Sequence, residues 1–171
     1  MRFAPLILLL LTGTVCAEPL QPFEAEFRLH VSKIPTTIKA TLELTPLEQA
    51  GQYRMRMENR SFLVKNREES HFVWNDCAPQ SLHYEHEFRG FGIRREHNMD
   101  FDWQASEVLF DDGKEKGRYG IEQGTLDELT MLLKAQCLLA EGKTEFTLTA
   151  AYGDKVRSHT FVVTGEEEIE T

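Results

Sequence analysis

Hydrophobic and polar residues alternate with a period of two along most of this chain. In the first such stretch, the hydrophobic residues at 23, 25, 27, 29 and 31 alternate with charged or polar neighbours. Strict alternation is typical of β-strands that bury one face and expose the other. The same pattern predicts further strands over residues 38–44, 53–57, 61–66, 69–74, 81–88, 93–103, 107–110, 118–121, 145–152 and 156–163.

The segments between these stretches are short and rich in turn-forming residues. Gly, Pro, Asn and Asp gather at residues 76–79, 90–92 and 111–113, and Gly153-Asp154 connects the last two stretches as a hairpin. Many strands with short connections favour an antiparallel meander over βαβ units.

One segment has helical periodicity instead. Apolar or small residues recur at helical spacing at Leu126, Leu129, Leu133, Cys137 and Ala140. Thr125-Leu126-Asp127-Glu128 has the sequence of a capping box with Thr125 as N-cap, and Gly142 supplies a stop, so we predict a helix over about 125–140. Additional leucines widen its apolar arc, and we expect it to be covered on more than one side.

The predicted fold class is therefore mainly β with one helix. A sheet of this many strands tends to curl. We expect a strongly curved antiparallel meander or incomplete barrel, with the helix packed on its concave face. No linker or repeat is evident, so residues 18–171 are predicted to form a single domain.

The amino-terminal residues have the pattern of an export signal. Arg2 precedes the apolar run at residues 6–11, and small residues follow at 15 and 17, which predicts cleavage after Ala17. Lipidation at Cys16 fits less well, because Val15 stands where a smaller residue is preferred. The apolar run is too short to span a bilayer. We expect a periplasmic protein without a transmembrane segment in its mature chain.

The charge of the chain limits its partners. The formal net charge is -9 at pH 7. Such an acidic surface argues against nucleic acid and against anionic lipid headgroups as partners.

Two cysteines remain after cleavage, Cys77 and Cys137. Their spacing matches neither a CxxC redox motif nor a zinc site, and an even number in an oxidising compartment favours a disulfide. It would close a loop of about 60 residues and contribute roughly 4 kcal/mol on the chain-entropy model. Two separate buried thiols are the alternative.

Short motifs along the chain resemble those of one family. They are Phe23–Val31, Gln52-Tyr53-Arg54, residues 68–72, Pro79 with Tyr84, Asp100-Phe101-Asp102-Trp103, residues 125–129 and residues 161–166. Through them the chain resembles the exported bacterial proteins of domain-of-unknown-function family 3108. The resemblance implies no catalytic residues. It also implies a curved sheet around a helix, which is similar to the fold of the periplasmic lipoprotein carriers.

Family members generally continue with further strands beyond the position of Thr171. Either this is a short member or those strands are absent, which would leave a sheet edge open.

The inward faces of the predicted strands supply candidate ligand-lining residues. They are Phe72, Trp74, Tyr84, His86, Arg95, His97, Met99, Phe101 and Trp103. Polar groups within an apolar cup are suggestive of a site for a ligand headgroup. Alternatively, the large apolar residues fill an ordinary core, and the face becomes polar where the strands extend beyond it.

The sequence gives little further evidence of a metal, catalytic or partner-binding site. His83, Glu85, His86 and Glu87 resemble a metal cluster, but the two histidines point to opposite faces of a strand, so we predict no metal site. No catalytic motif or cofactor fingerprint is present, so we predict neither catalytic residues nor a cofactor. The basic, aromatic turn with Arg89, Phe91 and Arg94 is a candidate partner contact.

These observations favour a non-enzymatic periplasmic protein that binds a hydrophobic envelope component, lipid or lipoprotein, in a cavity between sheet and helix. The alternative is a structural or adaptor protein of envelope biogenesis that acts through a sheet edge without a ligand cavity. An enzyme would require a cleft in which a histidine, such as His86 or His97, meets a carboxylate.

Overall fold

A computed structural model describes residues 19–30 and 37–165 of the 171-residue chain. The predicted signal sequence lies outside these described residues. The elements follow the chain in the order β1 (Phe23–His30), β2 (Thr37–Pro46), β3 (Gln52–Arg60), β4 (Val64–Val73), β5 (Gln80–Gly90), β6 (Ile93–Asp102), β7 (Glu107–Asp111), β8 (Lys116–Gly120), α1 (Glu128–Ala140), β9 (Glu145–Tyr152) and β10 (Lys155–Val162).

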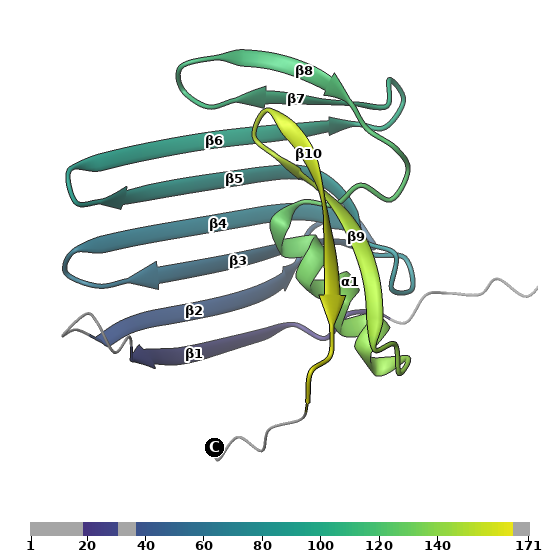
Figure 1. Ribbon diagram of the computed structural model, residues 1–171, viewed down its shortest axis with the longest axis horizontal. Helices are drawn as coiled ribbons and strands as arrows, with labels where there is room; N and C mark the ends of the chain where they lie inside the picture. Colours follow the sequence, from purple (N-terminus) through teal and green to yellow (C-terminus); the bar gives the residue numbers. More distant parts are fainter. Residues whose placement is uncertain (1–18, 31–36, 166–171) are drawn as a thin grey trace, which may run out of the picture.

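The first eight strands form one antiparallel sheet in sequence order, as expected for a meander (Figure 1). The sheet is not closed into a barrel, because β1 and β8 remain its two edges. Strands β9 and β10 form a separate two-stranded sheet, which confirms the predicted hairpin.

One strand is longer than the pattern predicted. Residues 61–66 and 69–74 were expected as two strands, but β4 runs without interruption from Val64 to Val73. The charged pair Arg67 and Glu68 does not break it, because its backbone pairs with β3 on one side and β5 on the other.

The helix α1 lies between the two sheets. Leu129 and Leu133 belong to the core shared with the large sheet, whereas Met131 and Ala135 pack with Leu148 and other residues of the small sheet. Figure 1 shows the hairpin β9–β10 crossing α1 on the side away from the large sheet. The expectation of cover on more than one side is therefore confirmed.

The start of α1 corrects the predicted capping box. The N-cap is Asp127, whose side chain accepts from the backbone N–H groups of Leu129 and Thr130, while the Thr130 hydroxyl accepts from the Asp127 N–H. Thr125 is not the cap, because the backbone of Leu126 still bonds with Thr149 and Ala151 of β9. The chain is thus extended until Asp127.

A disulfide joins Cys77 to Cys137 and confirms the predicted pair, with a Cα–Cα distance of 5.8 Å. It connects the β4–β5 loop to the last turns of α1. The Lys134 Nζ also donates to the Cys77 carbonyl oxygen at 2.8 Å. The helix is therefore held to the sheet by covalent, polar and apolar contacts. Among the described residues, no helix has the length and hydropathy needed to cross a membrane.

Candidate functional site

The concave face of the large sheet divides into two halves along the strands. Near the β4–β5 loop, α1 and the β9–β10 hairpin lie over it; near the β3–β4 and β5–β6 turns, neither element covers it (Figure 1). We call these regions the covered half and the open half.

The covered half is a packed core. Phe72, Tyr84 and Met99 have no exposed surface, and Phe101 is 7% exposed. They pack with Leu129 and Leu133 of α1. Side chains therefore fill the space in which the sequence placed a ligand cavity.

The two tryptophans among the candidate lining residues flank this core. Trp103 donates from its indole nitrogen to the Ser81 carbonyl oxygen at 2.7 Å and stacks on Phe101. Trp74 is partly buried against the same core. Both residues support the packing of the covered half.

A buried polar cluster fixes the amino-terminal end of α1 on the sheet. Ser70 of β4 donates to the Asp127 carboxylate at 2.6 Å. The Ser81 hydroxyl of β5 accepts from the Asp127 N–H and lies 2.9 Å from the Thr130 hydroxyl. These four residues are all buried and mutually hydrogen-bonded, as buried polar groups must be. Their hydrogen bonds fix the position of the first turn of α1, and the open half begins beyond it.

The open half changes from apolar to cationic across the sheet. Its apolar side chains on β1 to β3 are Phe27, Ile38, Ala40, Leu42 and Met57, which the strand register places on one face. Phe27 is 49% exposed, whereas Ala40 is buried and Leu42 and Met57 pack against the core of the covered half. Its side chains on β4 to β6 are Val64, Asn66, Glu68, His86, Phe88, Ile93, Arg95 and His97. Arg95 and His97, predicted as ligand-lining residues, lie at the cationic side of this face.

A chain of hydrogen bonds crosses the middle of the open half. His86 Nε2 donates to Asn66 Oδ1 at 2.6 Å, and the Asn66 amide donates to Glu68 at 2.9 Å. The Tyr84 hydroxyl donates to the other Glu68 oxygen at 3.2 Å. The buried Glu68 is thus stabilised from both sides.

His97 remains without a polar partner. Its ring packs edge-on against His86 at 4.8 Å between centroids. Within the described part of the chain, its buried Nε2 atom has no hydrogen-bond partner. Burial and the neighbouring His86 lower the pKa of His97 to about 4, so the ring is neutral at pH 7.

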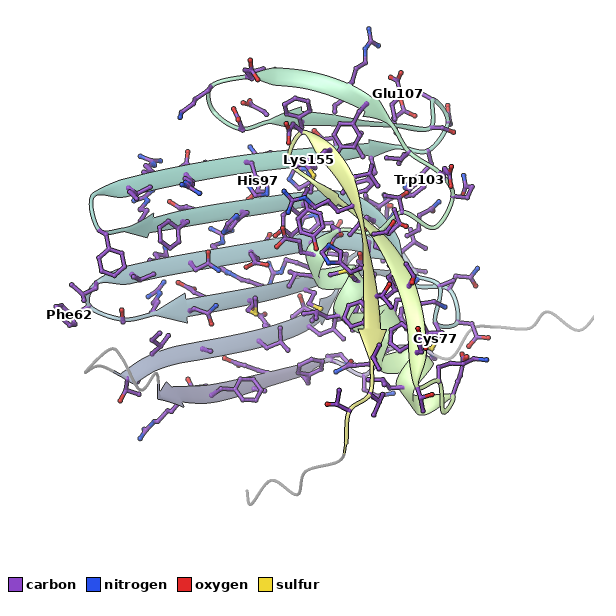
Figure 2. The ribbon with its side chains drawn as sticks, in the orientation of Figure 1. Phe62, Cys77, His97, Trp103, Glu107 and Lys155 are labelled. Carbon is purple, nitrogen blue, oxygen red and sulfur yellow. A yellow bond between two sulfur atoms is a disulfide. The ribbon has the colours of Figure 1, made fainter. Side chains whose placement is uncertain are left out.

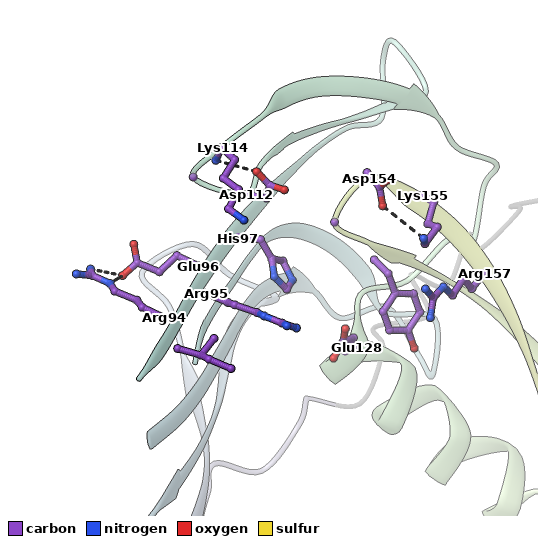
Figure 3. A pocket seen from close by; sticks show the side chains of 14 residues that line it. Arg94, Arg95, Glu96, His97, Asp112, Lys114, Glu128, Asp154, Lys155 and Arg157 are labelled. Carbon is purple, nitrogen blue, oxygen red and sulfur yellow. Dashed lines mark hydrogen bonds and ion pairs between the residues drawn. The ribbon is translucent and has the colours of Figure 1, made fainter. Parts of the chain in front are cut away.

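A groove of about 870 Å³ opens beside His97. The start of β6, the β7–β8 turn, the β9–β10 turn and the first residue of α1 form its walls (Figure 3). Its volume is within the range of small-molecule sites. Arg95 extends into it from β6 toward Glu128, whereas Arg94 turns away to pair with Glu96.

Three acidic residues that line this groove have hydrogen-bond or ion-pair partners close to them in the chain. Glu96 pairs with Arg94, Asp154 pairs with Lys155, and Asp112 accepts from the N–H groups of its own turn.

Three further cations at the groove, Arg95, Lys114 and Arg157, have no ion-pair partner among residues 19–30 and 37–165; Arg157 stacks over Tyr152. We call this site the cationic groove.

Glu128 lines the same groove as these cations, and its charge depends on pH. Burial raises its pKa to about 7, and the nearby Glu68 carboxylate adds to the shift, while Tyr84 and Arg157 oppose it. At pH 7 about half of Glu128 is therefore protonated, so its carboxylate neutralises the groove only in part.

Sequence reasoning found only part of this site. It selected Arg95 and His97, which the groove includes, but assigned Glu128 to capping and did not consider Lys114, Lys155 or Arg157. No local signal marks these four residues, because they reach the groove from three different elements. The structure does bring a histidine and a carboxylate, His97 and Glu128, to one groove, although it places no serine or cysteine nucleophile beside them within its walls.

The residues at 83–87 that resemble a metal cluster are divided between the two faces of β5. His83 lies on the convex face with Asp100 at 2.6 Å and Glu85 at 3.2 Å, while His86 lies on the concave face with Asn66. Among the described residues, no three His, Cys, Asp or Glu side chains converge as metal ligands would.

A curved open sheet, one helix held on its concave face and a cationic groove beside that helix define this as a mainly β protein whose sheet is covered on one half of its concave face. The chain belongs to the family of proteins of unknown function DUF3108, whose model matches residues 26–171. No curated protein and no solved structure matches it. The resemblance seen in the sequence is thereby confirmed, and function must be argued from the site.

Proposed function

We propose that this protein is an exported carrier or receptor for a single amphiphile with an apolar chain and an anionic head. The observation that carries the proposal is the graded open half of the concave face, which is mainly apolar on β1 to β3, polar on β4 and β5 at Asn66, Glu68 and His86, and bounded by the cationic groove beside β6. The Cys77–Cys137 disulfide supports the exported location, because such bonds persist in oxidising compartments.

The geometry suits a ligand of this kind. Adjacent strands lie about 4.8 Å apart, so the four steps from β6 to β2 span about 19 Å. That distance accommodates an extended acyl chain lying across the strands. Each methylene removed from water would contribute roughly 0.8 kcal/mol.

The head would occupy the cationic groove. Arg95, Lys114 and Arg157 supply donors that form no ion pair within the described residues, although Asp112 and Glu128 line the same groove, and guanidinium groups match phosphate or carboxylate geometry. Our sequence-based expectation placed the ligand between sheet and helix; the proposed site lies beside the helix, because the covered half is filled by side chains.

The test is a titration with lysophosphatidylglycerol below its micelle concentration, with lysophosphatidylcholine as the neutral-head control. We expect binding of the anionic lipid with at least tenfold preference, and Arg95→Gln should weaken it about tenfold. Arg118→Gln is the matched control, because Arg118 is an exposed cation on β8 that pairs with Glu107 outside the groove.

Native mass spectrometry of the protein purified without detergent supplies the second readout. A bound mass that extracts as an acyl lipid supports the proposal. A ligand-free mass, together with equal and weak binding of both lysolipids, would contradict it and favour the adaptor alternative.

A further inference from the structure

The most exposed large apolar side chains among the described residues belong to two turns at the same end of the sheet. Phe62 is 83% exposed in the β3–β4 turn, and Phe91 is 68% exposed in the β5–β6 turn. Leu63 at 40% and Ile93 at 47% adjoin them. Figure 2 shows Phe62 projecting beyond the end of the strands. We call these four residues the turn-end patch.

Strand register makes the two turns neighbours. Val64, which begins β4, pairs with Gly90, which ends β5. The contact is close, because a Cβ on Gly90 would lie 3.0 Å from Val64 Cγ2 and 3.2 Å from the Leu63 carbonyl oxygen. The turns that carry the two aromatic residues are therefore adjacent at this end of the sheet.

Phe91 occupies a position that does not suit its side chain. Gly90 pairs with Ile93, so Phe91 and Gly92 are the two central residues of a tight hairpin turn, with φ values of 52° and 75°. Turns with two positive φ values favour Asn-Gly, and an aromatic residue there is strained. Neither packing nor turn chemistry explains an exposed phenylalanine at this position.

A row of cations lies directly behind the turn-end patch. Arg60 pairs in register with Lys65, Lys65 with Arg89, and Arg89 with Arg94. Four like charges thus stand side by side across four strands, an arrangement that costs stability. On the same convex face, the acids of the next row, Glu58, Glu87 and Glu96, pair with them. Arg95 adds a fifth cation on the opposite, concave face, so five cations stand against these three acids near the turns.

We propose that the turn-end patch and the cationic row dock the protein on an anionic membrane surface. Exposed aromatic and aliphatic side chains at a tip enter the interface between headgroups and acyl chains, while arginine and lysine behind them contact phosphates. The acidic net charge of the chain does not prevent this contact, since charges more than about 10 Å away are screened at 0.1 M salt.

This docking would place the open half beside the bilayer, because the open half is bounded by the same turns (Figure 1). The inference goes beyond the proposed amphiphile site and does not depend on it.

The experiment is sedimentation of the full chain as exported with vesicles of phosphatidylcholine, with and without added phosphatidylglycerol. We expect partition into the anionic vesicles that weakens as salt is raised. Phe62→Ser should lower the partition coefficient about tenfold or more. Leu109→Ser, which changes an equally apolar side chain 47% exposed on β7, should change it less than twofold.

Phe91→Asn separates docking from folding. We expect it to lower vesicle binding several-fold while leaving the melting temperature unchanged or higher, because asparagine suits this turn. Absence of sedimentation with anionic vesicles, or equal losses in Leu109→Ser and Phe62→Ser, would overturn the docking surface.

Two further outcomes distinguish this inference from the proposed function. Loss of monomeric lysolipid binding in Phe62→Ser would place Phe62 in the lipid site and overturn docking. Salt-dependent vesicle binding with no lysolipid binding would support docking while contradicting the amphiphile site. Capture of a defined protein partner by the turn-end patch, with no vesicle binding, would overturn the proposed membrane docking.

Discussion

The two halves of the concave face belong to one sheet and share strands β2 to β6 but have different properties. In the covered half, Phe72, Tyr84 and Met99 are fully buried beneath α1. In the open half, Phe27 remains 49% exposed and Arg95 reaches into a groove. The difference arises from one helix and one hairpin, which lie over only one end of the strands (Figure 1).

This contrast shows how one face of a sheet comes to be covered over only part of its length. The concave side of the strands is mainly apolar beneath α1 and includes Asn66, Glu68, His86 and Arg95 farther along, and α1 has only 13 residues. The remaining part of that face lacks protein cover.

The largest expected difference between the halves is in packing energy. Phe72→Ala should lower the free energy of unfolding by about 3–5 kcal/mol, because it leaves a cavity in a fully packed core. Phe27→Ala in the open half should lower it by about 1 kcal/mol or less, because its ring is half exposed. Denaturant unfolding of both variants measures the contrast, and equal losses would contradict the division into two halves.

The disulfide should contribute the next largest effect. Replacing both Cys77 and Cys137 by Ala should lower the free energy of unfolding by about 2–4 kcal/mol, since it opens a loop with a sequence separation of 60. Reducing agent should lower the melting temperature of the wild-type protein similarly. An unchanged melting temperature in both cases would show that the bond does not hold α1 in place.

The Asp127 cap, which lies at the border of the two halves, should contribute less to the free energy of unfolding than the disulfide does. Asp127→Ala should cost about 1–3 kcal/mol, because Ser70 and two helix N–H groups lose their acceptor in a buried site. Asp127→Asn should cost less, since its amide oxygen can still accept from the helix. Thermal unfolding compares the two, and a larger loss in Asp127→Asn would contradict the assigned hydrogen bonds.

The smallest effect concerns the pH dependence of the open half. The pKa of Glu128 is raised to about 7 from 4.5, so its folded state binds the extra proton and its contribution to stability falls as pH rises through that range. The pKa of His97 is lowered to about 4 from 6.5, so its unfolded state binds the extra proton and its contribution rises with pH.

The two contributions oppose each other between about pH 4.5 and 6.5. Glu128→Gln should therefore leave stability rising with pH across this window, and His97→Gln should leave it falling. Melting temperatures of both variants and the wild type at pH 4.5, 5.5 and 6.5 check the signs. Parallel slopes in the two variants would show that neither group is perturbed as described.

The sequence predicted the local features of the fold well. The hairpin of β9 and β10 and the pairing of β5 with β6 through Gly90-Phe91-Gly92 follow from alternation and turn chemistry. The helix followed from its apolar spacing, although its cap was misassigned to Thr125. That error arose because Leu126 forms backbone bonds with β9, which are formed between residues distant in the chain.

Alternation also placed the candidate lining residues on one face of their strands, and it could not say which of them are covered. Phe72, Tyr84, Met99 and Phe101 became core, whereas Arg95 and His97 line the groove. The period of two predicts which face of its strand a residue occupies. Whether α1 covers that residue depends on where the helix docks, which is set by contacts between residues distant in the chain.

The sequence by itself therefore determined the strands, the helix, the face of each side chain and the family. Only the tertiary structure decided how far α1 extends over the sheet, that Glu128 and Arg157 meet Arg95, and that the turn of Phe62 adjoins that of Phe91. The physical reason is that propensity and periodicity act between neighbours in the chain. The site instead depends on strand register and helix docking, which are set by many weak contacts between distant residues.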